Sequence, residues 1–465
     1  MILLIGAPAG ADYSPEAHNG WRGRTIRALS TLPRLLRPLN SDHGARRPAA
    51  LEQRAFTAFS RGDFRIFFFA ATAAMMADNI EHVISYWVMF QAFHSAALGG
   101  FAVISHWVPF LLFSLYTGAL ADRHDCRRLI QISQALFMLA SVAWGLLFLA
   151  GRLQMWHAVV LLVIHGLAGV IGAPATQLVI HDMVPPEDLP SAIRLNASSR
   201  YLSILLGPAV GGGLMLLLGP AWGLLTNVLI YLPFTILLTR FPYTGHAARG
   251  AGKTASPFGL AEAWKIFAAV RTESTIVTMV LVAGATSFLV GNAFQAQMPA
   301  YANFLGADET GTRYTVLLAA DAVGAVIGVL LLETANFSRP SVHAAIGSAG
   351  LWGLTMGLFP LTRSYPTAVA LLVLAGVFNI AFQSMSQTLV QMLAPAPIRG
   401  RVVGLFNMAM LGLRAGSGLT VGLLGTFVGV RLSLAVSSFA VVIVSIALLL
   451  REARARSMLS FPAVR

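Results

Sequence analysis

The sequence predicts an all-α membrane protein with twelve transmembrane helices arranged in two pseudo-symmetric six-helix bundles. Only 11% of its 465 residues are charged and 56% are hydrophobic, whereas soluble domains carry about 25% charged residues. The apolar runs are continuous and helix-length, as in residues 129–150 and 436–450. A β-barrel would instead show short segments of alternating polarity. Because a span needs about 20 apolar residues, the chain has room for about twelve spans, short loops and a tail.

The predicted spans lie between a basic N-terminal segment and a basic C-terminus. We expect residues 1–60 to form a disordered cytoplasmic tail, and a start site assigned too early is the alternative. Residues 61–240 form the first bundle, 241–273 a cytoplasmic linker, 274–450 the second bundle and 451–465 a cytoplasmic tail. The expected spans lie near residues 64–90, 97–120, 128–150, 155–180, 190–217, 220–239, 274–299, 312–333, 342–361, 366–392, 401–424 and 430–450.

Basic residues fix the expected orientation. With the N-terminus inside, most lysines and arginines fall in the inner loops and tails, and the outer loops contain only Arg152, Arg313, Arg363 and Arg431. This is the positive-inside pattern. We therefore expect a multi-pass protein of the bacterial inner membrane with both termini in the cytoplasm. The formal net charge of +13 lies mostly on that side, so no nucleic-acid partner is expected.

The two halves match each other at a single offset of about 210 positions. The offset aligns Gly118 with Gly328, Gln177 with Gln387, Pro185 with Pro395, Gly212 with Gly422, and Gly219 with Gly429. Parallel repeats of this kind are typical of secondary transporters, which bind substrate between the halves near the membrane midplane. A chance pattern in a glycine-rich apolar sequence is the alternative.

The loop after the second span carries a dense cluster of charges. Residues 118–128 read Gly-Ala-Leu-Ala-Asp-Arg-His-Asp-Cys-Arg-Arg, and a glycine there permits close helix approach. The segment resembles the signature of the major facilitator superfamily, closest to its enterobactin-exporter-like and macrolide-efflux-like branch. The residues that match include Gly118, Asp122, Arg123, Asp125, Arg127 and Arg128. Cys126 stands where that branch has arginine, and the second half has only a degenerate copy with Leu332 and Glu333.

A glycine-rich helix follows in the fifth span. Its sequence contains Gly207, Pro208, Gly211 and Gly212, and it resembles the antiporter motif of the same superfamily, with Ser203 in place of the first glycine. Gly207 and Gly211 are four residues apart, so we expect them to share a face and to pack tightly against the opposing bundle. The resemblance implies proton-coupled export.

Ionisable residues inside the spans are functional candidates because each costs about 2.5–3.5 kcal/mol to insert at the midplane. Asp78, Glu81 and His82 share one face of the first span at i, i+3 and i+4, and together with Asp321 they are the predicted proton-coupling residues. Arg414 is the predicted substrate or charge-pair residue, and a pair with Asp78, Glu81 or Asp321 would cancel its charge.

Polar residues on the cavity-lining spans of the family are weaker substrate-site candidates. His165, Asn292, Asn379 and Gln383 lie on these spans, whereas His106, Gln295 and Asn407 are further possibilities. Packing residues that form local hydrogen bonds are the alternative interpretation.

Several kinds of chemistry have no sequence signature here. There is no phosphate-binding glycine-rich loop for ATP, and one cysteine with dispersed histidines offers no zinc spacing. No metal, cofactor or catalytic residue is expected, and the protein is not expected to be an enzyme. We expect a monomer whose partners are the lipid bilayer, protons and a small-molecule substrate.

The predicted function is proton-coupled export of a small hydrophobic or amphiphilic compound, a siderophore or a drug, by alternating access. The first alternative is proton-coupled uptake of a small metabolite. The second, from another class, is a non-transporting membrane scaffold or an intramembrane enzyme.

Overall fold

A computed structural model describes residues 57–185, 187–246, 260–306, 311–334, 340–395 and 398–460. The chain divides into Met1–Glu52 and Gln53–Arg465. Positions 1–56 of the predicted tail therefore lie outside the described residues. The described residues contain helices and turns but no β-strand.

Six long helices form the N-terminal half after a short 3₁₀-helix. These elements are η1 (Thr57–Ser60), α1 (Gly62–Phe93), α2 (Ala96–Arg123), α3 (Cys126–Leu149), α4 (Met155–Met183), α5 (Leu189–Leu218) and α6 (Pro220–Arg240). Local sequence explains the boundaries. The Ser95 side chain accepts a hydrogen bond from the amide of Leu98 and caps α2. Gly219 has φ +80° between α5 and α6, a conformation that glycine adopts without strain.

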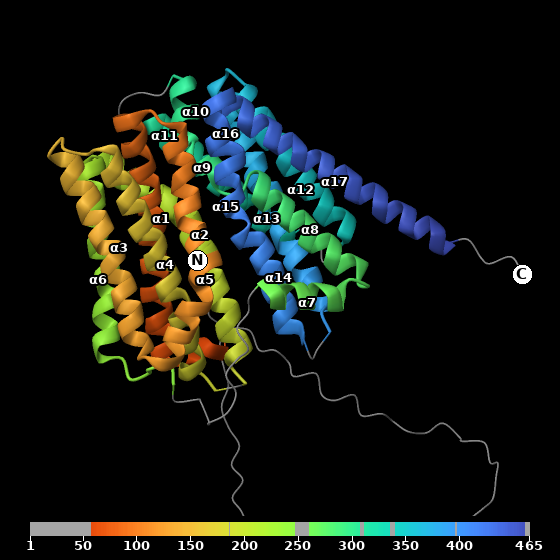
Figure 1. Ribbon diagram of the computed structural model, residues 1–465, viewed down its shortest axis with the longest axis horizontal. Coiled ribbons are helices and arrows are strands. Elements are labelled where there is room, and N and C mark those ends of the chain that lie inside the picture. The colour runs from red at the N-terminus through yellow and green to blue at the C-terminus, as the bar shows by residue number, and fades with distance from the viewer. Residues whose placement is uncertain are drawn as a thin grey trace, which may run out of the picture. The chain divides into compact units, whose positions relative to one another are not determined.

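The C-terminal half contains shorter and more broken helices. Its elements are α7 (Leu260–Val270), α8 (Ser274–Leu289), α9 (Ala293–Ala296), α10 (Met298–Phe304), α11 (Thr312–Thr334), α12 (Val342–Leu358), η2 (Phe359–Leu361), α13 (Tyr365–Leu393), α14 (Arg399–Asn407), η4 (Met408–Gly412), α15 (Arg414–Ser417), η5 (Gly418–Leu423), α16 (Leu424–Val428) and α17 (Val430–Ser460). Figure 1 shows α1–α6 grouped together in red to yellow-green and α8–α17 grouped together in green to blue.

Two of the expected continuous spans are interrupted, which corrects the sequence analysis. The expected span 274–299 breaks between α8 and α9, where Gly291 has φ +42°. The expected span 401–424 contains two π-helical segments, η4 and η5, on either side of α15. Such π segments occur frequently at functional sites, and α15 begins with Arg414.

Hydropathy and length identify 11 candidate membrane spans among the described residues. They correspond to the expected spans except the first. α1 is 32 residues long, but its ionisable residues include Asp63, Arg65, Asp78 and Glu81. It nevertheless packs against α5 and α6 inside the N-terminal half. These contacts make α1 a member of the N-terminal bundle, although hydropathy alone does not identify it as a span.

Other boundaries differ from the expected domain limits. The expected linker 241–273 contains α7, and residues 247–259 within it lie outside the described residues. α17 continues to Ser460, ten residues past the expected end of the second bundle. Its Glu452 is buried and accepts hydrogen bonds from Ser274 and Thr278. These bonds tie the extension of α17 to the start of α8.

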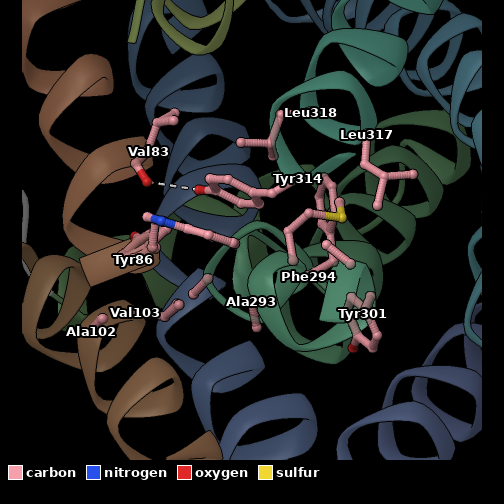
Figure 2. Close-up of a cluster of buried hydrophobic side chains, with 14 of the residues drawn as sticks. Val83, Tyr86, Ala102, Val103, Ala293, Phe294, Tyr301, Tyr314, Leu317 and Leu318 are labelled. Carbon is pink, nitrogen blue, oxygen red and sulfur yellow. Dashed lines mark hydrogen bonds between the residues drawn. The ribbon is translucent and has the colours of Figure 1, made fainter. Parts of the chain in front are cut away.

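The two halves meet at one end of the helices, where α1 ends and α2 begins; we call this the closed end. A hydrophobic cluster joins the halves there, with Val83 and Tyr86 from α1 facing Phe294 and Tyr314 (Figure 2). The hydroxyl of Tyr314 donates to the carbonyl of Val83 at 2.8 Å. The side-chain amide of Gln297 likewise donates to the carbonyl of Ala96 at 2.7 Å. Both bonds run between the halves.

Glycines allow the backbones to touch at the closed end. A Cβ atom on Gly100 of α2 would lie 2.7 Å from the carbonyl oxygen of Gly418, and one on Gly422 would lie 2.1 Å from the Cα of Gly100. No other residue leaves room for this approach between α2 and η5. The repeat-related glycine Gly422 therefore has a packing role at the interface between the halves.

Candidate functional site: a polar cavity between the halves

A cavity of about 770 Å³ lies between the two halves. The N-terminal half supplies wall residues from α1 to α6, and the C-terminal half supplies residues near Asn292, on α11 and from α14 to Arg414. Most of the wall is apolar or aromatic, with a small number of polar groups. This is the composition typical of small-molecule sites. The polar groups of the N-terminal half are concentrated on α1, α2 and the helices behind them.

A buried hydrogen-bond network centres on Glu81 of α1. Glu81 is 1% exposed and lies between α3 and α4. The hydroxyl of Ser141 donates to its Oε2 at 2.5 Å, and Nδ1 of His165 lies 2.7 Å from its Oε1. Asn227 of α6 extends the network, since its Nδ2 lies 3.4 Å from the Ser141 Oγ and donates to the carbonyl of Ala77. Burying a carboxylate is costly unless it is paired in this way.

Asp78 lies one turn before Glu81 and forms part of the cavity wall. Its Oδ1 is 2.8 Å from His165 Nε2, without the alignment of a hydrogen bond. The same oxygen is 3.7 Å from Nδ1 of His82. Thus His165 lies between two carboxylates, Glu81 on one ring nitrogen and Asp78 on the other.

The helical spacing of α1 explains this arrangement only in part. Asp78 and His82 are four residues apart and both reach the cavity. Glu81 is turned far enough around the helix to point into the bundle, toward Ser141 and His165. Asp78 and His82 therefore lie on the cavity face of α1, whereas Glu81 does not share that face and lies behind it.

Three histidine rings converge beside Asp78. They come from different helices, His82 from α1, His106 from α2 and His165 from α4, and their ring nitrogens lie within 4.8 Å of one another. The linear spacing of the histidines gave no sign of a cluster. The cluster depends on the packing of α2 on α4, which is close because a Cβ on Gly166 would lie 1.9 Å from the carbonyl of Ser105.

Arg414 enters the cavity from the C-terminal half. Its guanidinium carbon lies 5.2 Å from the centre of the Trp107 ring, and its Nε donates to the carbonyl of Met410 at 3.3 Å. An arginine over a tryptophan face is a favourable cation–π contact. Asp78 and Glu81, two of the predicted partners of Arg414, have their short contacts with His165 instead.

The remaining candidates fall on and off the cavity. Asn292, Gln295 and Asn407 are wall residues. Asn379 and Gln383 are not among the wall residues, and they form a hydrogen bond with each other at 2.8 Å along α13. Asp321 is also absent from the wall, and its Oδ1 is buried without a hydrogen-bond partner in the described part of the chain.

The charged loop between α2 and α3 is docked within the N-terminal half. Asp125 caps α3 by accepting a hydrogen bond from the amide of Arg127, and it also pairs with the Arg127 guanidinium at 2.6 Å. The side-chain hydrogen bonds from Arg127 lower the pKa of Asp125 below its usual value. Arg127 also donates to the carbonyl of Phe241, and the amide of Cys126 donates to that of Thr244. The loop is thus fastened to the segment that follows α6.

Four other residues of the motif differ from Asp125 and Arg127. A Cβ added to Gly118 would meet nothing within 4 Å. The close helix approach expected at that glycine is therefore not present in this conformation. Asp122, Arg123 and Arg128 are exposed. The side-chain hydrogen bonds of Asp125 and Arg127, with the Cys126 amide, hold the loop in place.

The glycine-rich helix α5 contacts both halves, which corrects the expected direction of Gly207 and Gly211. A Cβ on Gly207 would lie 2.4 Å from that of Asn79, and one on Gly211 would lie 3.2 Å from the Cα of Ile80. Both glycines therefore face α1 in the same half. Gly212, one residue further around the helix, faces Thr315 of α11 in the other half at 2.0 Å. Pro208, within the same helix, lies on the cavity wall.

Ser141, Asn227 and Trp107 are the site residues that sequence reasoning missed. Ser141 and Asn227 are fully buried. A serine or asparagine inside an apolar span is a weak signal, because such residues commonly bond to their own helix. Only the contact of Ser141 and Asn227 with the Glu81 region identifies them.

The sequence is similar to that of a described protein family and to part of a curated transporter. The sequence model of a family described as "Transmembrane secretion effector" matches residues 53–461. A curated relative, the staphyloferrin A transporter of Staphylococcus aureus (strain NCTC 8325 / PS 47), is 22% identical over 185 residues. The match covers 38% of this chain and 47% of that protein, so it spans about half of the relative's length.

Solved structures of transporters share the fold. A bacterial homologue of the human lysosomal transporter Spinster, in an inward-facing and unoccupied conformation, has a TM-score of 0.63 at 14% identity, covering 85% of this chain and 96% of the other. The nucleoside transporter NupG has a TM-score of 0.63 at 13% identity, covering 86% and 100%. The D-xylose-proton symporter has a TM-score of 0.58 at 16% identity, covering 83% and 95%. The predicted major facilitator fold, with two helical bundles, is confirmed.

Proposed function

Because the chain belongs to the transmembrane secretion effector family and is a secondary transporter of the major facilitator type, we propose that it exports a small hydrophobic or amphiphilic compound in exchange for protons. Siderophores and drugs are the substrate classes proposed. The observation that carries the proposal is the cavity of about 770 Å³ between the halves. Its volume lies within the range of about 300–1,000 Å³ that small-molecule sites have.

Alternating access requires the two halves to touch at one end of the helices while the cavity extends toward the other end. The halves are in contact at the closed end through Tyr314–Val83 and Gln297–Ala96. The cavity wall extends toward the opposite end, to Gln177, Arg200 and Gly404. With the orientation that the basic loops predict, the closed end faces outward and the cavity receives its substrate from the cytoplasm. An exporter loads its substrate from that side.

The proposed coupling group is Asp78, because it is the acidic side chain on the cavity wall. Glu81 and His82 flank it, and His165 lies between the two carboxylates at 2.8 and 2.7 Å. A proton arriving from the outward-open state would occupy this cluster, and release of the proton inside would accompany return to the inward-open state. Asp321, which is not on the cavity wall, is proposed only as a second proton site.

Everted inner-membrane vesicles test export and its direction together. Respiration makes the vesicle lumen acidic, and a proton-exchanging exporter then lets added substrate collapse the pH gradient. The probes are staphyloferrin A and a macrolide, each added to vesicles with and without the protein. We expect at least one probe to dissipate the gradient and to accumulate in the lumen. Efflux of preloaded probe from the lumen together with protons would instead establish uptake in the cell.

The Asp78→Asn variant tests the coupling group. We expect substrate binding to remain within a few-fold of wild type and the substrate-dependent collapse of the pH gradient to be lost. The matched control is Glu273→Gln, since Glu273 is exposed and its side chain does not cap α8. Undiminished collapse in the Asp78→Asn variant would exclude Asp78 as the coupling group while leaving the export proposal standing.

A further inference from the structure

The three converging histidines on the cavity side of α1, α2 and α4 have the geometry of a metal site. The ring centres of His82 and His165 are 4.6 Å apart, those of His82 and His106 are 4.9 Å apart, and those of His106 and His165 are 5.5 Å apart. One ligand nitrogen from each ring lies within 4.8 Å of the other two. Four ligand atoms around one zinc ion at about 2.0 Å are about 3.3 Å apart. Metal binding would therefore draw the three nitrogens closer together than they are here.

The hydrogen bonds at Nδ1 of His82 and of His165 direct the Nε2 atoms of both rings toward possible metal coordination, although Nε2 of His165 also faces Asp78 at 2.8 Å. Nδ1 of His82 lies 2.8 Å from the carbonyl oxygen of Asp78. A carbonyl can only accept, so Nδ1 carries the hydrogen and Nε2 keeps its lone pair. Nδ1 of His165 likewise lies against the Glu81 carboxylate at 2.7 Å. Metal-binding histidines are held in this way, by a carbonyl or carboxylate on the other ring nitrogen.

One buried ring atom, Nδ1 of His106, lacks a hydrogen-bond partner within the described residues. Nε2 of His165 and Oδ1 of Asp78 face each other at 2.8 Å without the alignment of a hydrogen bond. His165 is 4% exposed, so these two atoms meet in a buried place. An unpaired buried polar atom costs free energy, and a cation bound here would give Nδ1 of His106 a partner and would take Nε2 of His165 and Oδ1 of Asp78 as neighbouring ligands.

Two carboxylates lie at the cluster, against one cation, Arg414, which lies over the Trp107 ring beside His106. Asp78 supplies one carboxylate as a fourth ligand, and Glu81 supplies a second negative charge directly behind His165. Ser141 fixes Glu81 from α3. Three imidazoles with one carboxylate suit late first-row divalent ions, whereas Mg²⁺ and Ca²⁺ prefer oxygen ligands.

The ion would be accessible from the cavity. Asp78, His82 and His106 belong to the cavity wall, and His165 lies behind them. We propose that His82, His106, His165 and Asp78 bind one late first-row transition-metal dication, with Zn²⁺ as the representative ion. The site belongs to the N-terminal half and needs no assumption about the direction of transport. It shares Asp78 with the proposed coupling group, so a bound ion would compete with the coupling proton there. Metal binding is therefore measured without transport, so that the site and the export proposal fail separately.

Metal binding by the purified full-length protein tests the proposal directly. The protein in detergent is treated with a chelator, desalted and titrated with Co²⁺, and Zn²⁺ is then added as a competitor. We expect one ion per chain, visible ligand-field bands typical of nitrogen and oxygen coordination, and displacement by Zn²⁺. The His106→Gln and His165→Gln variants should each weaken binding at least tenfold. The control is His343→Gln, since His343 lies in the first turn of α12 and is not on the cavity wall.

The design separates loss of ligands from loss of folding. His165→Gln removes a partner of Glu81 and could unfold the bundle, whereas His106 has no hydrogen bond at its Nδ1 in the described part of the chain. Size-exclusion profiles and thermal unfolding of each variant are compared with wild type. Absence of Co²⁺ and Zn²⁺ binding in the wild-type protein, or unchanged binding in a folded His106→Gln variant, would overturn the site.

Reconstituted vesicles then distinguish a resident ion from cargo. Zn²⁺ movement across the membrane without any other compound would identify the ion as cargo. Retention of one ion per chain through many transport cycles of an organic probe would identify it as resident. Either result supports the site.

Discussion

Glu81 shows at the residue scale why a charge can be tolerated inside the N-terminal bundle. Each of its oxygens has a partner, Ser141 on Oε2 and His165 on Oε1, and the carboxylate is 1% exposed. Replacing one partner leaves a buried acceptor unsatisfied, and that costs more than the bond itself contributes. The stability of this region therefore depends on neutral residues as much as on charged ones.

Ser141→Ala should accordingly destabilise the protein by about 1–3 kcal/mol, because Glu81 Oε2 loses its hydroxyl donor in a place that is only 1% exposed. Thermal unfolding in detergent measures the loss. The matched control is Thr388→Ala, which removes an exposed hydroxyl that bonds only to the Ser384 carbonyl of its own helix. Equal unfolding temperatures for the Ser141→Ala variant and the wild type would contradict the role assigned to Ser141.

At the scale of helices, close contact depends on where each glycine points. α2 meets η5 through Gly100, Gly418 and Gly422, and the atoms there are too close for a side chain. α5 uses one pair of glycines against α1 and a third glycine against α11. The same residue type therefore serves packing inside a half and contact between halves, and only the contacts between halves must break during alternating access.

Gly100→Ala should weaken the closed end without unfolding either half, because its Cβ would lie 2.7 Å from the carbonyl oxygen of Gly418. A cysteine at Ala102, which is 2% exposed and is not on the cavity wall, reports opening in a Cys126→Ser background. We expect thiol labelling to rise several-fold in the Gly100→Ala variant. Gly213→Ala is the control, since a Cβ there would meet nothing within 4 Å. Labelling no faster than in that control would contradict the role of Gly100 in sealing the closed end.

Sequence reasoning predicted the elements better than it predicted their contacts. Hydropathy located the spans because every long apolar run must become a helix in lipid. It could not locate the break at Gly291 or the π segments around Arg414, where side chains bond between helices, Ser287 to the Met410 carbonyl and Thr420 to the Leu289 carbonyl. The direction of Gly207 was predicted wrongly for the same reason. Periodicity shows that two residues share a face without showing which helix covers it.

The candidate site was predicted in part. Asp78 and Arg414 were found because ionisable residues inside spans are costly and rare, and both lie on the cavity. The histidine cluster was not found, since its members are separated by 24 and 59 positions and meet only through the packing of α1, α2 and α4. A cluster assembled from different helices leaves no spacing pattern in the sequence.

At the scale of the whole transporter, the two halves have to separate at the closed end for the cavity to reach the other side. The contacts there are a hydrophobic cluster with two hydrogen bonds, Tyr314–Val83 and Gln297–Ala96. No ion pair joins the halves at this end among the described residues. Apolar contact with few polar bonds lets the interface open without stranding buried charges.

A covalent link across the closed end should therefore stop transport and spare binding. A Cβ on Gly99 would lie 2.7 Å from Nε2, the far end of the Gln297 side chain, so cysteines at these two positions should be bridged by a short, reducible bifunctional thiol reagent in a Cys126→Ser background. We expect the cross-linked protein to bind substrate from the open side with unchanged affinity and to lose transport, and we expect a reductant to restore it. A cysteine pair at Gly145 and Leu225, bridged in the same way, is the matched control, because it links α3 to α6 within one half, where a Cβ on Gly145 would lie 2.9 Å from Cγ of Leu225. Continued transport by the fully cross-linked Gly99–Gln297 pair would show that the halves do not separate there.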